Sequence, residues 1–276
     1  MSTLVLGALY TLVAIGLSLV FGIMRIINFA HAQVYVLGAF GFYYLSEVFG
    51  IAWWLAAALA ALGVALTAVV LEALLIRPLR GDPLRSMIVT LGLLLAMNGA
   101  MVSAFGADPK YVSPAISGAI DLAGTSVARQ KVVAVGVAIA LVTALFLCLK
   151  WTRPGRAMRA IADDAVGARL QGIGVHRINA LGFSVGSGLA ALAGGLILPL
   201  TSAVSPAVGD GILPKMFIIV ILGGLGSVGG AVVGALTLAA IETIGFTYLG
   251  EIANLFIYLL VLLVLLIRPE GIFGRA

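Results

Sequence analysis

The feature that most constrains this chain is a series of uninterrupted apolar runs, each about as long as a membrane-spanning helix. A helix needs about 20 predominantly apolar residues to cross the hydrocarbon core of a bilayer. The clear runs are Thr3–Met24, Ile51–Ile76, Met87–Gly106, Lys131–Lys150, Asn179–Pro199 and Ile252–Ile267. Residues 32–49 form a further candidate span, which is shorter and more polar. The sequence therefore predicts an all-α polytopic membrane protein.

Composition supports lipid as the solvent of this chain. Of its 276 residues, 62% are hydrophobic and 10% are charged, whereas soluble domains carry about 25% charged residues. The net charge of +5 is compatible with nucleic-acid binding. However, the basic residues cluster in short loops between apolar runs, which is the positive-inside pattern of membrane proteins. We therefore assign the charge to topology and expect no nucleic-acid partner.

The distribution of arginine predicts the topology. Loops 77–86 and 150–178 are rich in arginine and are assigned to the cytoplasm, which places 107–130 and 200–212 outside. The tail, with Arg268 and Arg275, is assigned to the cytoplasm by the same rule. A single span between 213 and 250 would place the tail outside, so we expect two membrane elements in that region. We expect about nine membrane segments, with the first run retained as a span and the N-terminus outside.

A glycine-rich stretch marks the expected break between those two elements. Leu213–Leu222 is too short to cross the membrane alone, so we expect a half-helix there. Exposed backbone at membrane depth is tolerated only inside protein or beside a wet cavity, which predicts a pathway element at Gly223, Gly224, Gly226 and Ser227. The stretch also matches the G-x-G-x-x-G fingerprint, but no soluble βαβ unit surrounds it. Close helix packing explains those glycines better than nucleotide binding.

A second break is predicted near the start of the chain, where RIINFAHAQ interrupts two apolar helices. Polar groups at such depth are candidates for function, and the alternative is an interfacial loop with a satisfied histidine. We predict that this segment lines the translocation pathway through Asn28, Phe29, Ala30, His31 and Gln33.

The remaining polar residues give little support to catalysis. Glu72 is expected to be an interfacial charge, and the deeper Glu242 either packs between helices or has a further role. The only cysteine is Cys148, and the only histidines are His31 and His176. These residues form no catalytic triad and no metal site, and the chain carries no G-x-x-x-x-G-K-[ST] motif. We expect a protein that is not an enzyme, holds no metal or cofactor and has no ATPase site of its own.

The charge-dense segment WTRPGRAMRAIADDAVGARLQGI, residues 151–173, is predicted to form short helices on the cytoplasmic face. Thr152 is suited to cap a helix that begins at Pro154, Asp163 or Asp164 to cap a second one, and Gly172 to end it. We expect this segment to dock on an ATPase, whereas the alternative is a basic amphipathic helix resting on lipid. The predicted coupling residues are Arg156, Arg159, Ala162, Asp163, Asp164, Ala165, Arg169, Leu170 and Gly172. The small residues Ala160, Ala162, Ala165, Gly167 and Ala168 are expected to allow close approach.

Four motifs in order resemble the LivH-type permeases of branched-chain amino-acid ABC transporters. They are GLSLVFGIMRIINFAHAQVYVLGAF, RAMRAIADDAVGARLQGI, ILGGLGSVGGAVVGA and the RPEGIFG tail, and they span nearly the whole chain. One departure is Ala32, where the family usually has glycine. The resemblance implies a single permease domain, residues 1–276, with a type II ABC importer-like fold and a coupling segment at 151–178.

The resemblance also implies partners. These are a LivM-type second permease, two ATP-binding subunits and a periplasmic substrate-binding protein, all serving a multi-pass protein of the bacterial inner membrane. Branched-chain amino acids are the expected substrates, with urea, short amides or aromatic carboxylates as alternatives. A secondary transporter is a further alternative, which predicts buried charge pairs and an inverted repeat. An intramembrane enzyme or scaffold is the third.

Overall fold

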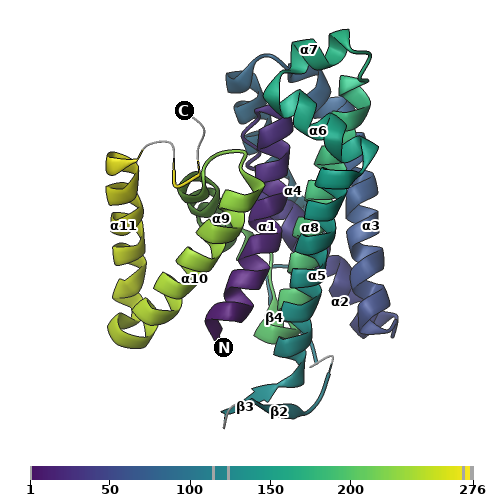
Figure 1. Ribbon diagram of the computed structural model, residues 1–276. Helices are drawn as coiled ribbons and strands as arrows, with labels where there is room; N and C mark the ends of the chain where they lie inside the picture. The colour runs from purple at the N-terminus through teal and green to yellow at the C-terminus, as the bar shows by residue number, and fades with distance from the viewer. Residues whose placement is uncertain (1, 114–115, 123–124, 269–270, 274–276) are drawn as a thin grey trace.

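The computed structural model describes residues 2–113, 116–122, 125–268 and 271–273, and it is almost entirely helical (Figure 1). The expected Arg275 lies outside the described residues. The helices are α1 Ser2–Met24, α2 His31–Tyr43, α3 Trp53–Leu71, α4 Pro83–Phe105, α5 Arg129–Trp151, α6 Arg153–Asp163, α7 Ala165–Leu170, α8 Val175–Thr201, α9 Val208–Gly223, α10 Val228–Leu249 and α11 Ala253–Ile267. Short π or 3₁₀ turns occupy Tyr44–Val48, Glu72–Ile76, Arg77–Leu79 and Gly250–Ile252. The strands are β1 Lys110–Tyr111, β2 Ala119–Leu122, β3 Thr125–Ala128 and β4 Ala203–Val204.

Six helical segments in the described part of the chain are long and apolar enough to cross a membrane. Three further helices, α2, α9 and α11, have 13, 16 and 15 residues, so at about 1.5 Å per residue they fall short of a 30 Å core. The predicted break at the glycines is confirmed, because α9 ends at Gly223 and α10 begins at Val228.

The start of α9 corrects the sequence-based boundary. We expected a loop over 200–212 and a half-helix from Leu213, but the helix begins five residues earlier, at Val208. Its first turn carries Asp210, which favours a helix N-terminus. Pro214 is accommodated inside the helix, so it does not mark the helix start.

The polypeptide runs back and forth between two ends of the molecule, in agreement with the predicted alternation of the loops. At one end, Arg25 contacts the carbonyl of Ala162 and Arg80 contacts His176. At the other end, β1 pairs with β4, and the Ser113 amide donates to Glu47. Figure 1 shows α6 and α7 capping the first end and the β2–β3 hairpin projecting from the second.

The core consists of α1, α2 and α8, which other helices surround. Most residues of α1 from Val5 onward are buried, as are more than half of the residues of α8. Small residues allow this close packing: a Cβ added at Gly38 would overlap the backbone of Ala191, and one added at Gly16 would overlap Gly186. These contacts bring the backbones of α2 and α1 directly against α8.

Candidate functional site

The first break separates α1 from α2 and leads the chain back into the protein. Helix α1 ends at Met24, and Arg25 takes a left-handed φ of 53°, which is uncommon for a residue other than glycine. Six residues later, His31 Nε2 lies 3.3 Å from the carbonyl oxygen of Val13, midway along α1. We call residues 25–30 the polar break. His31 and Gln33, which we expected within it, instead lie in the first turn of α2.

Two neighbouring helices hold the polar break in place. Thr90, fully buried on α4, donates its hydroxyl to the carbonyl oxygen of Ile27 at 3.1 Å. The ring of Phe29 packs against Phe217 of α9, with 5.1 Å between the ring centroids. The backbone of the break is therefore braced by a specific hydrogen bond and an aromatic contact from two different helices.

The polar side chains at this position are buried without the hydrogen bonds they normally make. Asn28 is 1% exposed, and both its side-chain nitrogen and its oxygen lack partners in the described part of the chain. The same holds for the Gln33 amide and for His31 Nδ1, while His31 Nε2 has the Val13 carbonyl. Hence the alternative of a fully satisfied histidine does not describe His31.

Hydroxyl groups on the same three core helices share this property. Ser18 on α1, Tyr35 on α2 and Ser187 on α8 are also buried with unpaired oxygens. We call these three residues with Asn28, His31 and Gln33 the polar core cluster. Burying an unpaired amide or hydroxyl costs about 1–3 kcal/mol. So many unpaired groups in one core are a liability for stability, and they favour a role in binding water or a polar ligand.

The second break, residues 224–227, is satisfied within the chain, and we call it the glycine break. Gly224 and Gly226 adopt φ values of 100° and 81°, which glycine allows without strain. Ser227 caps α10 by accepting the Gly230 amide at 3.0 Å. A Cβ added at Gly223 would overlap the carbonyl oxygen of Gly230. Close packing of α9 on α10 is therefore the role that the geometry gives to Gly223.

The predicted pathway residues of the glycine break divide into two groups. Gly223 and Gly224 are buried between helices. Gly226 and Ser227 line a cavity of about 1050 Å³ at the end of the molecule that carries α6. Arg25 and Lys150 also line this cavity, together with Arg156 and Arg159. Its basic lining agrees with an assignment of this end to the cytoplasm.

The segment between α5 and α8 folds as two capped helices. The Thr152 hydroxyl accepts the Gly155 amide at 3.1 Å, and Asp164 accepts the Val166 amide at 2.9 Å. Gly172, with φ 79°, follows the end of α7. The cap at Thr152 and the stop at Gly172 were predicted from sequence, and of the two residues predicted as alternatives for the second cap, the structure uses Asp164.

The outer surface of these helices is apolar at two points. Val166 and Leu170 are 70% and 82% exposed, although large aliphatic side chains are usually buried. Ala165 is exposed beside them. Ala168 is 6% exposed and faces the rest of the chain, so it is removed from the expected docking surface.

The predicted coupling arginines already interact with their own chain. Arg156 and Arg159 point their guanidinium groups at the carbonyl oxygens of Trp151 and Lys150, at 3.5 and 3.2 Å. Cations are favourable at the carboxyl end of a helix, here α5. Arg169 is exposed at the end of α7. Arg156 and Arg159 therefore fix α6 on the end of α5.

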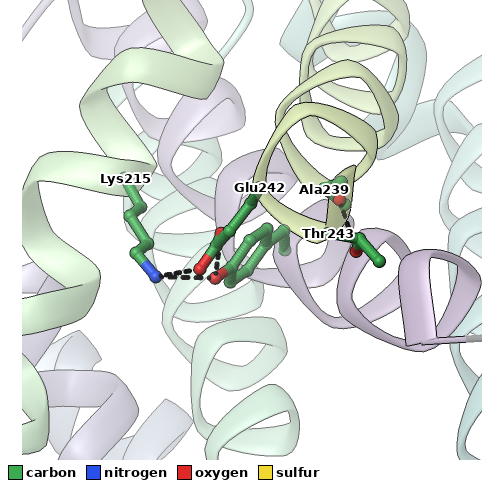
Figure 2. Close-up of polar contacts among 5 residues, drawn as sticks. Lys215, Ala239, Glu242 and Thr243 are labelled. Carbon is green, nitrogen blue, oxygen red and sulfur yellow. Dashed lines mark hydrogen bonds and ion pairs between the residues drawn. The ribbon is translucent and has the colours of Figure 1, made fainter. Parts of the chain in front are cut away.

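Sequence reasoning missed one cluster within the membrane segments. Lys215 of α9 donates to Glu242 of α10 at 2.6 Å and to the Tyr10 hydroxyl of α1 at 3.0 Å. Tyr10 in turn donates to the other Glu242 oxygen at 2.8 Å. Figure 2 shows Lys215 and Glu242 pointing toward each other from their two helices. We call these three residues the charged triad. The sequence signal that could have indicated this cluster was the presence of Lys215 and Glu242 in one apolar region, because ionisable residues are rare in membrane segments.

Glu72 also differs from its prediction. We expected an interfacial charge, but its side chain is 1% exposed and paired with Arg80. Burial lowers the pKa of the Arg80 guanidinium group. Arg80 also reaches His176, which is exposed as expected. Arg80, held by Glu72, therefore links the turn after α3 to His176 at the beginning of α8.

Comparison with known proteins finds likeness along the whole chain. The family described as "Branched-chain amino acid transport system / permease component" matches residues 1–266. The permease protein LivH of Salmonella typhimurium is 32% identical over 98% of this chain and 92% of its own. The permease protein BraD of Pseudomonas aeruginosa is 32% identical over 99% and 94%. Escherichia coli LivM is 26% identical over 97% and 68%. No solved structure matches the chain.

Proposed function

The chain belongs to the family of branched-chain amino acid transport system permease components, and we propose that it forms half of the translocation pathway of an ATP-driven importer for branched-chain amino acids. Family membership makes it a multi-pass protein of the plasma membrane, in accord with its six long apolar helices. The match over 1–266 supports one permease domain, residues 1–276, with the coupling segment 151–178 inside it.

The alternatives raised by the sequence have less support. The matched relatives named LivH, BraD and LivM are all described by branched-chain amino acid transport, and none by urea, amides or aromatic carboxylates. A secondary transporter predicts buried charge pairs, and the charged triad contains one. The family match along the chain nevertheless assigns it to permease components.

The proposed partners follow from the family and from what this chain lacks in its sequence. Similarity to LivM as well as to LivH supports a second permease of related fold. Two ATP-binding subunits would supply the hydrolysis, because the sequence holds no phosphate-binding loop. A periplasmic substrate-binding protein would deliver the amino acid to the outer end. The chain itself would need no cofactor and no metal, and it would perform no chemistry on its substrate.

The polar core cluster supports a pathway through α1, α2 and α8. A permeating amino acid loses its hydration inside the membrane and needs polar partners there. Asn28, His31 and Gln33 hold unpaired donors and acceptors, and His31 lies beside the midpoint of α1. The neighbouring Phe29 and Ala30 would line the same part of the pathway. Gly226 and Ser227 would line the cytoplasmic exit of the pathway.

The observation that carries the importer proposal is the exposed apolar surface of Val166 and Leu170. Apolar side chains on short, capped helices at a basic end form a projection suited to a groove in another protein. A helix resting on lipid would tolerate a bulky residue beside them, but a docked helix would not. The distinction gives a direct test of whether an ATPase subunit binds here.

We predict that Ala165→Trp uncouples or releases the ATPase subunits. Overpacking a small position at an interface costs about 1–3 kcal/mol, enough to lower copurification of the ATPase about tenfold. The measurement is copurification from mild detergent, together with ATPase activity stimulated by the loaded binding protein. The matched control is Ala107→Trp, an exposed alanine at the opposite end, which should change neither. Wild-type values for Ala165→Trp would favour the lipid-resting alternative.

A further inference from the structure

The charged triad lies deep within the helices, and its lysine side chain is partly exposed. Tyr10 is about 12 Å along α1 from its outer end, and Glu242 about 10 Å from the outer end of α10. The Lys215 side chain is 28% exposed, against 8% for Glu242. Charges at such depth are costly and commonly mark substrate routes. The triad is therefore placed within the outer half of the membrane segments, with part of the Lys215 side chain exposed.

The hydrogen bonds of the triad leave defined vacancies for a ligand. An ammonium group has three hydrogens, and Lys215 uses two of them, on Glu242 and on Tyr10. One hydrogen of Lys215 thus has no acceptor in the described part of the chain. Each carboxylate oxygen of Glu242 accepts one bond, from Lys215 or from Tyr10, although each can accept two. A donor and two acceptor positions are available without breaking the triad.

Helix α9 connects the triad to the polar core cluster. On either side of Lys215, α9 carries Gly209, which lies against the Gln33 amide, and Phe217, which contacts Phe29. The same helix thus touches the polar break and presents the lysine to α1 and α10. Along α9, Lys215 therefore lies between the position that meets Gln33 and the position that meets Phe29.

We propose that the charged triad is a binding site for the two charged groups of a permeating α-amino acid. The carboxylate takes the remaining hydrogen of Lys215, and the ammonium takes the remaining lone pairs of Glu242. The pair and a zwitterion together have zero net charge, so binding adds no uncompensated charge in a medium where such a charge is costly. A lone carboxylate would add a negative charge, and an amide would make no ionic contact. This inference rests on the proposed function and assigns it a substrate class.

The competing role for the triad is a purely structural tie between α1, α9 and α10. An uncharged replacement distinguishes the two, because replacing a buried ion pair by neutral groups of similar volume is often neutral for stability. In Lys215→Met with Glu242→Gln, the glutamine still accepts the Tyr10 hydroxyl. If the triad only joins helices, leucine uptake survives this double change, whereas a binding site for a zwitterion loses both of its charged groups.

The experiment reconstitutes the complete complex in vesicles and measures uptake of L-leucine and ATP hydrolysis. We expect the double variant to assemble and to keep its stimulated ATPase, while leucine uptake per ATP falls at least about tenfold. The control replaces the other buried pair, Glu72→Gln with Arg80→Gln, and should retain uptake. Uptake at the wild-type level by the Lys215→Met, Glu242→Gln variant would overturn the inference. Absence of leucine uptake by the wild-type complex would instead overturn the proposed function.

A second measurement on the wild-type complex covers the case in which the variant does not assemble. An amine-acetylating reagent is applied with and without L-leucine, and modification of each lysine is followed by mass spectrometry. Leucine should slow modification of Lys215 and leave the exposed Lys150 unaffected. Isoamylamine at equal concentration controls for consumption of the reagent and lacks the carboxylate. Equal modification of Lys215 with leucine and with isoamylamine would contradict the proposal.

Discussion

The polar break and the glycine break both interrupt apolar helices, but they differ in how their polar groups are satisfied. At the glycine break, the Ser227 cap and the contact of Gly223 with Gly230 leave a tight turn between packed helices. At the polar break, Asn28 is buried with its whole amide group unpaired. The backbone there is braced from outside, by Thr90.

The comparison shows that a helix break alone does not identify a pathway. Sequence reasoning grouped the two breaks because both interrupt a hydrophobic run. The structure separates them by their hydrogen bonds. The glycine break is paired within the chain and joins two packed helices, whereas the polar break contains a buried amide group without hydrogen-bond partners. Changes at the glycine break should therefore reduce assembly, whereas changes at the polar break should reduce transport in an assembled complex.

The largest expected effect is from Gly223→Leu. The added side chain would overlap the Gly230 carbonyl, so α9 and α10 must separate, at a cost of about 1–3 kcal/mol or more. We expect loss of the assembled complex, measured by size-exclusion chromatography after mild solubilisation. The matched control is Gly229→Leu, where an added Cβ meets no atom within 4 Å. Normal assembly of Gly223→Leu would contradict the packing role proposed for the glycine break.

Asn28→Leu should separate transport from stability. Leucine removes a buried amide without partners, so we expect unchanged or slightly increased thermal stability, by up to about 1–3 kcal/mol. Leucine uptake by the reconstituted complex should nevertheless fall about tenfold or more, because a polar partner of the substrate is lost. Asn98→Leu on α4, the same change away from the polar break, serves as the control. Full uptake by Asn28→Leu would make the polar break a connector only.

The smallest effect sharpens the comparison by removing one hydroxyl group at each break. Thr90→Val removes the bond to the Ile27 carbonyl, and Ser227→Ala removes the cap on Gly230. Each should lower the free energy of unfolding by about 1 kcal/mol. Only Thr90→Val should also change the KM for uptake, and Thr90→Ser should restore it. Equal effects of both changes on uptake would show that the two breaks are functionally alike.

The parts of the fold that sequence predicted are those fixed by neighbouring residues. The cap at Thr152, a second cap at Asp163 or Asp164, the stop at Gly172 and the split between α9 and α10 each depend on residues within a few positions. Arginine placement likewise gave the alternation of loops. These signals are local, so they can be read along the chain without knowledge of which helices meet.

The parts that sequence did not predict depend on contacts between distant residues. The Tyr10–Glu242 bond joins the first helix of the described chain to its tenth, and no local pattern reports it. The burial of Ala168 and the pairing of Glu72 with Arg80 likewise depend on how helices pack. The candidate site was thus located in sequence at its breaks, but its charged triad required the fold.

The position of α1 at the centre of the core has a consequence for how the protein is made. The helix is synthesised before α8 and α10, yet Gly16 packs on Gly186 and Gly7 on Ala239, which emerge much later. At about 5–20 residues per second, α1 waits in the bilayer for roughly 10–50 s before these partners arrive. Its mean hydropathy of 2.4 suits that interval, whereas α8, at 1.8, enters a membrane where α1 is already present. Biogenesis, as well as the finished core, thus favours nearly uniform apolarity in a helix that is synthesised before its partners.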